Sequence, residues 1–312
     1  MTNNLPTVGW IGAGRMGFQL AKRLLDAGYD VAVYNRTKSK AEPLSEFGAT
    51  IVDSPVELAG RDVVFIMVST GKDLKQVVLG DGGLLTDPAK APKIIADSST
   101  VDTDTSVEIR AAVEARGTGF LATPVSGNPK VIAAGKLTVA ASGPREVFDE
   151  VEPMLQTWGR GVTYVGEGEL ARIVKIAHNV MLGVVIQNLI EITLLAEKSG
   201  VKRSDFLKFF NDSVMGSPFT KYKSPALVNL DFKATFTNVL LLKDLDLGLE
   251  AAHELGVVMP VTSATRQVVA SEVGDGNVEQ DFSSLITTWA RHSGMQLTPE
   301  NVPFDDGLDP ES

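Results

Sequence analysis

Apolar residues follow two different patterns along this chain, and the change from one to the other divides it. Up to about residue 166, short apolar runs of strand length alternate with stretches in which apolar residues recur every three or four positions. Strands that alternate with helices predict an α/β fold, a doubly wound parallel sheet of the Rossmann type. The expected strands span residues 7–11, 31–34, 50–52, 63–68, 93–96, 120–122, 137–141 and 162–165.

Beyond residue 166 the strand signals stop and only helical patterns continue. Residues 169–198 form one long helical pattern closed by Gly200, a typical C-cap residue. Its apolar positions run nearly all the way around the helix, so it must be covered on several sides. Further helices are expected at residues 204–211, 238–255, 262–273 and 281–292.

These patterns predict three parts of the chain. A Rossmann domain spans residues 1–166, and an all-α domain that begins with a long interdomain helix spans residues 167–298. Residues 299–312 form an acidic tail, and its end, residues 305–312, has little to bury, so we expect that end to be loose.

A glycine-rich turn joins the first expected strand to the first expected helix. Gly12 permits a tight turn, Gly14 lets the backbone approach a pyrophosphate, and Gly17 allows the helix to pack closely against the strand. The helix N-terminus then offers unpaired N–H groups to the phosphates. The sequence therefore predicts a dinucleotide site, with a glycine turn of some other α/β protein as the weaker alternative. Its residues are Gly12, Ala13, Gly14, Arg15, Met16 and Gly17.

The end of the second strand indicates which dinucleotide binds. NAD enzymes usually carry an acid there, roughly 20 residues past the glycines, to hold the ribose 2′-hydroxyl. This chain has Asn35, Arg36 and Thr37 instead. With no carboxylate there to repel a 2′-phosphate, Arg36 can form a planar, charge-assisted fork to it. We expect these residues to bind NADP, with NAD possible; the alternative is a solvated strand end.

Composition narrows the setting of the protein. The chain has 312 residues, 44% of them hydrophobic and 22% charged, which is typical of globular domains. A net charge of −10 argues against nucleic acid and anionic membranes as partners. Cysteine is absent and no signal peptide pattern opens the chain, so we expect a cytoplasmic protein. Three scattered histidines do not predict a metal site.

The long helix carries the candidate reacting groups. Lys175 and Asn179 are four residues apart and share a helix face. An ammonium stabilises the charge that builds on a carbonyl oxygen accepting hydride and can donate the proton, and partial burial would lower its pKa towards the working range. The alternative is that Lys175 pairs with an acid such as Glu169 or Glu191. His178, three residues from Lys175, is expected to have a supporting role.

The long helix contains polar side chains among its apolar ones. These polar side chains are too many for a helix that spans a bilayer, so we expect the helix to be buried inside protein. A helical domain of this size can hardly cover it alone, which predicts a homodimer or homotetramer.

Two polar loops follow apolar strands. Thr100 closes the segment Asp97-Ser98-Ser99-Thr100 and is expected near the nicotinamide or the substrate, although a helix N-cap is the alternative. Ser126 and the amides after it can hold a carboxylate, although a plain surface turn is the alternative.

These motifs, in this order and over nearly the whole chain, resemble the β-hydroxyacid dehydrogenase family, relatives of 3-hydroxyisobutyrate dehydrogenase and of the tartronate semialdehyde and glyoxylate reductases. The family pattern G-x-x-G-x-G-x-x-x-K-x-x-x-N is met by Gly166-Glu167-Gly168 leading to Lys175 and Asn179, without its first glycine. The other matching segments are residues 9–17, 97–100, 122–128 and 243–245.

The resemblance implies roles for individual residues. Lys175 would be the catalytic lysine and Asn179 a substrate ligand, while Ser126 and Gly127 would form a carboxylate-binding turn. The family usually has a glycine where this chain has Asn128, the residue type that next best tolerates a left-handed backbone. Asn128 would therefore keep the turn and add a polar group beside the substrate. By the same resemblance, the cofactor would be lined by Met67, Val68, Thr100 and Lys243.

The sequence thus predicts an NADP-preferring oxidoreductase. It would interconvert a small β-hydroxyacid, or another hydroxy-carboxylate, and its semialdehyde or ketone by hydride transfer. An imine reductase of related architecture is one alternative, which Lys175 disfavours, and a non-catalytic dinucleotide-binding scaffold is another. A decarboxylating relative of 6-phosphogluconate dehydrogenase would need a longer helical domain.

Overall fold

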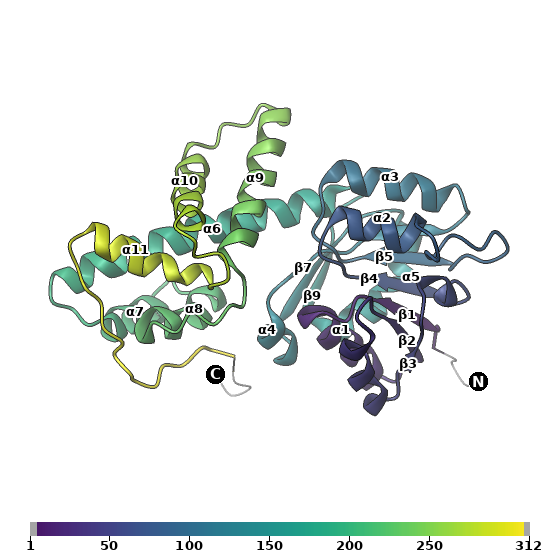
Figure 1. Cartoon of the computed structure of the whole chain (residues 1–312), viewed down its shortest axis with the longest axis horizontal. Helices are drawn as coiled ribbons and strands as arrows, with labels where there is room; N and C mark the ends of the chain where they lie inside the picture. Colours follow the sequence, from purple (N-terminus) through teal and green to yellow (C-terminus); the bar gives the residue numbers. More distant parts are fainter. Residues whose placement is uncertain (1–4, 309–312) are drawn as a thin grey trace. The chain divides into compact units, whose positions relative to one another are not determined.

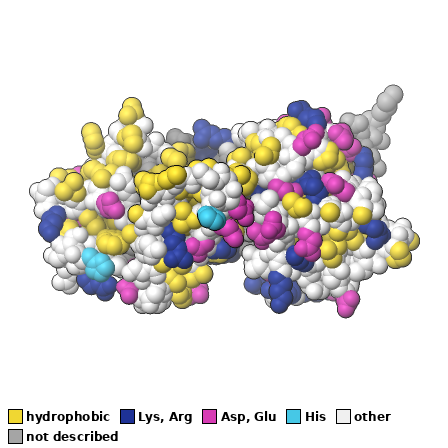
Figure 2. Space-filling model, turned by 90° about the horizontal axis from the view of Figure 1, so that it is seen from above, with side chains coloured by type: hydrophobic (Ala, Val, Ile, Leu, Met, Phe, Trp, Pro, Cys, Tyr) yellow, Lys and Arg dark blue, Asp and Glu magenta, His cyan; other side chains and the backbone are white. Residues whose placement is uncertain are grey.

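The computed structural model describes residues 5–308 and divides into two compact units, Met1–Lys175 and Ile176–Ser312 (Figure 1). The division falls inside one long helix, α6 (Leu170–Lys198). Figure 2 shows acidic and basic side chains interspersed with hydrophobic ones on the surface of both units. The domain boundary expected after residue 166 stays a prediction.

A six-stranded parallel sheet forms the centre of the first unit, in the order β3-β2-β1-β4-β5-β6. This confirms the doubly wound parallel sheet. The strands end in register, because Ile11 lies opposite both Tyr34 and Ile66, and Ile66 lies opposite Asp97. The carboxyl ends of four strands therefore share one edge, where open α/β sheets bind ligands. The strands are β1 (Val8–Ile11), β2 (Val31–Tyr34), β3 (Thr50–Ile51), β4 (Val63–Ile66), β5 (Ile94–Asp97) and β6 (Gly119–Ala122).

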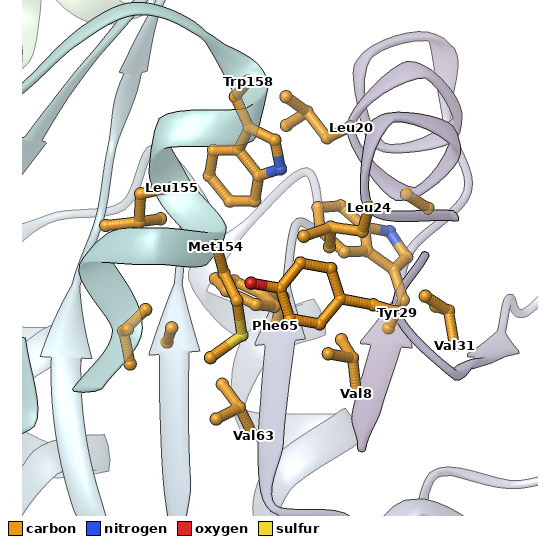
Figure 3. Close-up of a cluster of buried hydrophobic side chains, with 14 of the residues drawn as sticks. Val8, Leu20, Leu24, Tyr29, Val31, Val63, Phe65, Met154, Leu155 and Trp158 are labelled. Atoms are coloured by element: carbon orange, nitrogen blue, oxygen red, sulfur yellow. The ribbon is translucent and has the colours of Figure 1, made fainter. Parts of the chain in front are cut away.

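Each face of this sheet has its own hydrophobic core. Trp10 and Phe65, on neighbouring strands, stack with ring centroids 5.7 Å apart, and Trp158 meets Phe65 at 5.1 Å (Figure 3). Ile11 and Ile66 point to the opposite face, because successive side chains of a strand alternate. The helices of this unit are α1 (Arg15–Asp26), α2 (Gly71–Leu79), α3 (Thr103–Glu114), α4 (Pro129–Ala133) and α5 (Arg145–Leu155).

The last strands of the first unit form a sheet of their own, a feature the apolar pattern did not predict. In this second sheet β8 (Leu137–Ala141) pairs antiparallel with β7 (Val125–Ser126) and parallel with β9 (Gly159–Tyr164). Only Thr123 and Pro124 separate β7 from β6. That is too short for a parallel crossover, which needs about a dozen residues, so the chain leaves the main sheet there.

The second unit is helical and contains one helix that the pattern did not predict, α8 (Pro218–Asn229). Pro218 begins this helix, where the missing N–H is harmless, and Ser217 forms a capping box with Thr220. Pro225 lies inside the helix, where proline is disfavoured because it lacks an N–H. The other helices after α6 are α7 (Arg203–Asp212), α9 (Asn238–Leu255), α10 (Pro260–Gly274) and α11 (Leu285–His292).

The expected acidic tail begins with a segment that is hydrogen-bonded to the helical unit. The Glu300 carboxylate accepts the backbone N–H of Arg203 at 2.8 Å, and Asn229 exchanges hydrogen bonds of 2.9 and 3.1 Å with Val302. An acidic side chain is favourable at a helix N-terminus, so Glu300 holds the start of this segment onto α7. The looseness expected of residues 305–312 stays a prediction. Residues 309–312 of the predicted tail lie outside the described residues.

Helix α6 is only partly covered by its own chain. By length and composition it is apolar enough to cross a membrane, yet half of its most apolar window is buried within the protein. A core helix of a soluble protein passes the same test. Met181 and Leu195 are 67% and 72% exposed.

Candidate active site

The glycine loop between β1 and α1 has the backbone that a dinucleotide needs. A Cβ on Gly12 would lie 2.1 Å from the Met67 carbonyl oxygen, and one on Gly17 would lie 1.9 Å from the Gly12 oxygen. A Cβ on Gly14 would meet nothing within 4 Å, so this glycine faces open space. It also begins α1 without a side-chain cap. Free space beside an uncapped helix N-terminus is the arrangement that receives a pyrophosphate.

The end of β2 is tied to the glycine loop and also to α2. Asn35 accepts the Ala13 N–H at 2.9 Å and donates to the Thr37 carbonyl at 2.8 Å. Arg36 extends outward with 83% of its side chain exposed, and its Nη1 lies 2.8 Å from Oδ1 of Asp73 in the first turn of α2. The expectation that no carboxylate stands here is therefore wrong. The sequence has no acid at the strand end, but the fold brings one from another helix.

The ends of β4 and β5 bring the expected cofactor-lining residues to neighbouring positions. Met67 and Val68 follow β4, and the half-buried Thr100 follows β5. Between them, the Ser99 hydroxyl accepts the Val68 N–H at 3.0 Å and donates to Asp97 Oδ1 at 2.6 Å. A hydrogen-bonded chain therefore connects the two strand ends.

The expected substrate turn follows Ser126 at the end of β7. Gly127 has φ 145°, and a Cβ on it would lie 2.7 Å from Leu137 Cδ1, so glycine is required there. Asn128 has φ −129°, an extended backbone open to any residue, which corrects the expectation of a left-handed position. Its buried side chain accepts the Val131 N–H at 3.0 Å and caps α4.

A buried arginine, which the sequence reasoning missed, lies one turn before Lys175. Arg172 is 1% exposed and donates from Nη2 to Asp97 Oδ2 at 2.5 Å, from Nη1 to the Ser99 carbonyl at 2.6 Å, and from Nε to the Ser106 hydroxyl at 3.1 Å. Its only sequence signal was an arginine within an apolar helical pattern. The fork joins α6 to the end of β5 and to α3.

The start of α6 is fixed by a second contact. Glu169 accepts Nε of Arg110 at 2.5 Å and the hydroxyl of Ser106, so both carboxylate oxygens of this candidate partner of Lys175 are engaged. Counted back from Lys175, the family pattern places glycines at 166, 169 and 171, where this chain has Gly166, Glu169 and Ala171. Gly168 is thus out of register with the pattern, and a buried charge stands in place of a glycine.

Asn179 is held within the second unit by a residue that the sequence reasoning also missed. It is 4% exposed and donates from Nδ2 to Asp244 Oδ2 at 2.5 Å, while its Oδ1 lies 3.0 Å from His178 Nδ1. Asp244 is itself buried, and its other oxygen lies 3.5 Å from Nζ of Lys243. The sequence signal for Asp244 was the segment 243–245, in which only Lys243 was assigned a role. Within residues 5–308, no group of three or more acidic or histidine side chains is placed to hold a metal ion.

Two family models together match most of the chain. Residues 7–166 match the family model described as the NAD binding domain of 6-phosphogluconate dehydrogenase. Residues 169–289 match the model described as the NAD-binding domain of NADP-dependent 3-hydroxyisobutyrate dehydrogenase. The fold and the glycine loop thus define an NAD(P)-dependent oxidoreductase.

Individual relatives narrow the class. Glyoxylate/succinic semialdehyde reductase 1 of Arabidopsis thaliana is 31% identical over 89% of this chain and 96% of its own. The cytokine-like nuclear factor N-PAC of Drosophila melanogaster is also 31% identical over 89% of this chain, which spans 46% of that protein. The solved 3-hydroxyisobutyrate dehydrogenase of Mycobacterium tuberculosis with L-serine has a TM-score of 0.78 at 26% identity, covering 91% of this chain and 99% of its own. The chain belongs to the β-hydroxyacid dehydrogenase family.

Proposed function

We propose that this protein is an NADP-preferring reductase that interconverts a small β-hydroxyacid, or a related hydroxy-carboxylate, and its semialdehyde or ketone. The observation that carries the proposal is Lys175 itself, held one helical turn from a buried arginine that ties α6 to the cofactor edge of the sheet. Relatives named as glyoxylate/succinic semialdehyde reductase and 3-hydroxyisobutyrate dehydrogenase support the substrate class.

Lys175 acts as the acid and base in this proposal. When bound, the reduced nicotinamide supplies the hydride that forms the new C–H bond at the carbonyl carbon. The Lys175 ammonium stabilises the negative charge that develops on the carbonyl oxygen and gives that oxygen its proton, which leaves a neutral amine to be reprotonated from solvent. In the oxidative direction the neutral amine accepts the hydroxyl proton.

The substrate carboxylate binds the turn that starts at Ser126. In this proposal the N–H groups after Ser126 and Gly127 donate to the carboxylate, as backbone donors do in other anion sites. Asn179, whose carboxamide is oriented by the buried Asp244, contributes a further substrate contact. These groups position the substrate carbonyl and neither gain nor lose a proton in the reaction.

Arg36 provides the preference for NADP. Its guanidinium is largely exposed and is already oriented by Asp73. A 2′-phosphate carries more charge than the single carboxylate of Asp73, so it competes well for the same fork. NADH lacks this contact.

Exposed apolar side chains of the helical unit support self-association in the cytoplasm. A homodimer or homotetramer would cover Met181, Leu195, Phe209 and Val214, which are 67%, 72%, 73% and 100% exposed. Light scattering at micromolar concentration should give a dimer or a multiple of one, and a monomer would contradict this assembly. Neither nucleic acid nor membrane is a partner in this proposal.

A substrate panel tests the proposed function. We expect NADPH consumption with small semialdehydes and keto acids, glyoxylate and succinic semialdehyde among them, and consumption slower by a factor of at least ~10² with Lys175→Ala under the same conditions. Turnover of cyclic imines alone would overturn the proposal in favour of an imine reductase. No turnover of any panel member, with NADPH bound normally, would favour a scaffold.

A further inference from the structure

Four charged side chains form a closed, buried cluster where α6 meets the sheet. Asp97 and Arg172 are 0% and 1% exposed, and the side chains of Glu169 and Arg110 are 8% and 12% exposed. The two positive and two negative charges cancel, and Ser106 lies between the pairs, donating to Glu169 and accepting from Arg172. No role in cofactor or substrate binding has been assigned to any of these residues.

The geometry points to Arg172 as a positioning residue that fixes Lys175 relative to Thr100 at the cofactor edge of the sheet. This inference deepens the proposed function and rests on Lys175 being the acid and base. Arg172 itself touches neither cofactor nor substrate; it acts through the two segments that it joins.

On the sheet side, Arg172 fixes the peptide unit that leads into Thr100. Its Nη1 donates to the carbonyl of Ser99, and that carbonyl shares a rigid plane with the N–H of Thr100. Its Nη2 holds one oxygen of Asp97, whose other oxygen accepts the Ser99 hydroxyl. Because that hydroxyl in turn accepts the N–H of Val68, one arginine orders the ends of two strands.

On the helix side, Arg172 fixes the turn that carries Lys175. The two residues are three positions apart, so their side chains lie on neighbouring parts of one helix face. Helix ends fray unless they are held, and α6 begins at Leu170. Here Glu169 is pinned by Arg110 just before the helix, which prevents the first turns from rotating or sliding.

The chemistry of the cluster indicates that it orients the segments that it joins and adds little net stability to the fold. A protein with a buried ion pair is often no more stable than the same protein with apolar residues of similar volume in its place. The planar guanidinium donates to three acceptors, two at the end of β5 and one on α3, whereas a lysine offers one ammonium at a single point. Lysine in place of Arg172 would therefore keep the charge balance and lose the geometry.

The chain offers a matched control in the second unit. Arg203 is 0% exposed and forks to the carboxylate of Glu197 at 2.6 Å and to the carbonyls of Val228 and Thr298 at 3.0 and 2.5 Å. None of these partners is a proposed site residue. Arg203→Lys thus makes the same substitution in an equally buried fork away from the proposed chemistry.

The test compares Arg172→Lys, Arg203→Lys and Lys175→Ala with the wild type, using the best substrate of the panel. We expect Arg172→Lys to lower kcat by about 10- to 100-fold per folded molecule, as misplacement of a reacting group by an ångström can do. The kinetic isotope effect with 4-deuterated NADPH should rise, because the hydride step becomes slower than product release. A loss of folded molecules alone would leave the isotope effect unchanged. Arg203→Lys should lower thermal stability and leave kcat and the isotope effect as in the wild type.

A readout without cofactor completes the test. Amide hydrogen exchange in Arg172→Lys should speed up in residues 98–106 and 170–178 and not in the rest of the chain. If Arg172→Lys does not fold, Ser106→Ala removes one arm of the fork and should give smaller changes in the same direction. Wild-type kcat, isotope effect and exchange in the folded variant would overturn the inference, while full activity of Lys175→Ala would instead overturn the proposed function.

Discussion

Two buried arginines, one in each unit, form similar forks in different surroundings. Arg172 joins the first turn of α6 to β5 through Asp97, and Arg203 joins α7 to the C-terminal segment and pairs with Glu197. Both side chains are withdrawn from water. Similar chemistry therefore serves the proposed reaction in one unit and only the packing of the chain in the other.

The two forks also differ in how completely they are satisfied. Each of the three nitrogens of Arg172 donates a hydrogen bond, whereas Nε of Arg203 is among the buried atoms without a partner in the described residues. Asp97 is fully buried, whereas a quarter of the Glu197 side chain reaches water. The fork of Arg172, which is fully buried and fully hydrogen-bonded, lies where two proposed site segments must be held together. Its completeness is consistent with a role in fixing the positions of these segments.

The largest effect should come from removing the group that Arg172 is inferred to position. Lys175→Ala should lower kcat by ~10²–10⁴-fold, the usual contribution of acid–base catalysis, with NADPH affinity near normal. His178→Ala, on the same helix, is the control and should lower kcat much less. Steady-state turnover and NADPH fluorescence titration measure both. Near-normal turnover of Lys175→Ala together with an inactive His178→Ala would reverse the two roles.

The second effect separates the two forks by stability. Arg172→Met leaves Asp97 charged, buried and unpaired, which should lower the free energy of unfolding by about 3–5 kcal/mol. Arg203→Met should lower it by less, about 1–2 kcal/mol, because water can reach Glu197. Urea unfolding monitored by circular dichroism measures both values. A larger loss for Arg203→Met would contradict the account of how the forks differ.

A smaller effect concerns the exposed Arg36, which pairs with Asp73 as the buried arginines pair with their acids. Arg36→Ala removes one charge-assisted contact to a 2′-phosphate and should weaken NADPH by about 1.5–3 kcal/mol, with NADH little changed. Asp73→Asn is the companion variant and should tighten NADPH, because the competing carboxylate is gone. Equal weakening of both cofactors by Arg36→Ala would refute the NADP preference.

The last effect is confined to acid and concerns a further buried pair, Lys223 with Asp281. Burial would raise the pKa of Asp281, but the Lys223 ammonium and several hydrogen bonds hold it below its usual value. A carboxyl with a lowered pKa in the folded state contributes stability that is present above its unfolded pKa of ~3.9 and is lost as the pH falls further. Wild-type melting temperature should therefore drop below about pH 4, and Asp281→Asn should flatten this drop. An equally steep drop in Asp281→Asn would show that other acids cause it.

What the sequence could predict was local. Apolar runs predicted the strands of the main sheet, and the glycine loop was readable because Gly12, Gly14 and Gly17 act within a few residues of one another. The spacing of Lys175 and Asn179 was readable for the same reason. Such features depend only on residues that are close together along the chain, so a single sequence is enough to predict them.

What the sequence could not predict was the pairing of distant residues. Arg36 and Asp73 are 37 positions apart, Asn179 and Asp244 are 65 apart, and Arg172 and Asp97 are 75 apart. Periodicity says which face of a helix is buried, but not which acid a buried arginine meets. Strand β7 and helix α8 were missed for another reason: β7 is only two residues long, and α8 contains Pro225, a residue that is disfavoured inside helices.

The central claim is that the Lys175 ammonium donates the proton in carbonyl reduction, and the pH dependence of kcat/KM tests it most directly. The account predicts that wild-type kcat/KM for reduction falls at high pH with one ionisation, as the ammonium loses its proton. In Lys175→Ala the residual activity should show no such ionisation, while in Arg172→Lys, which keeps the amine, it should persist at lower amplitude. The same ionisation in Lys175→Ala as in the wild type would contradict the claim.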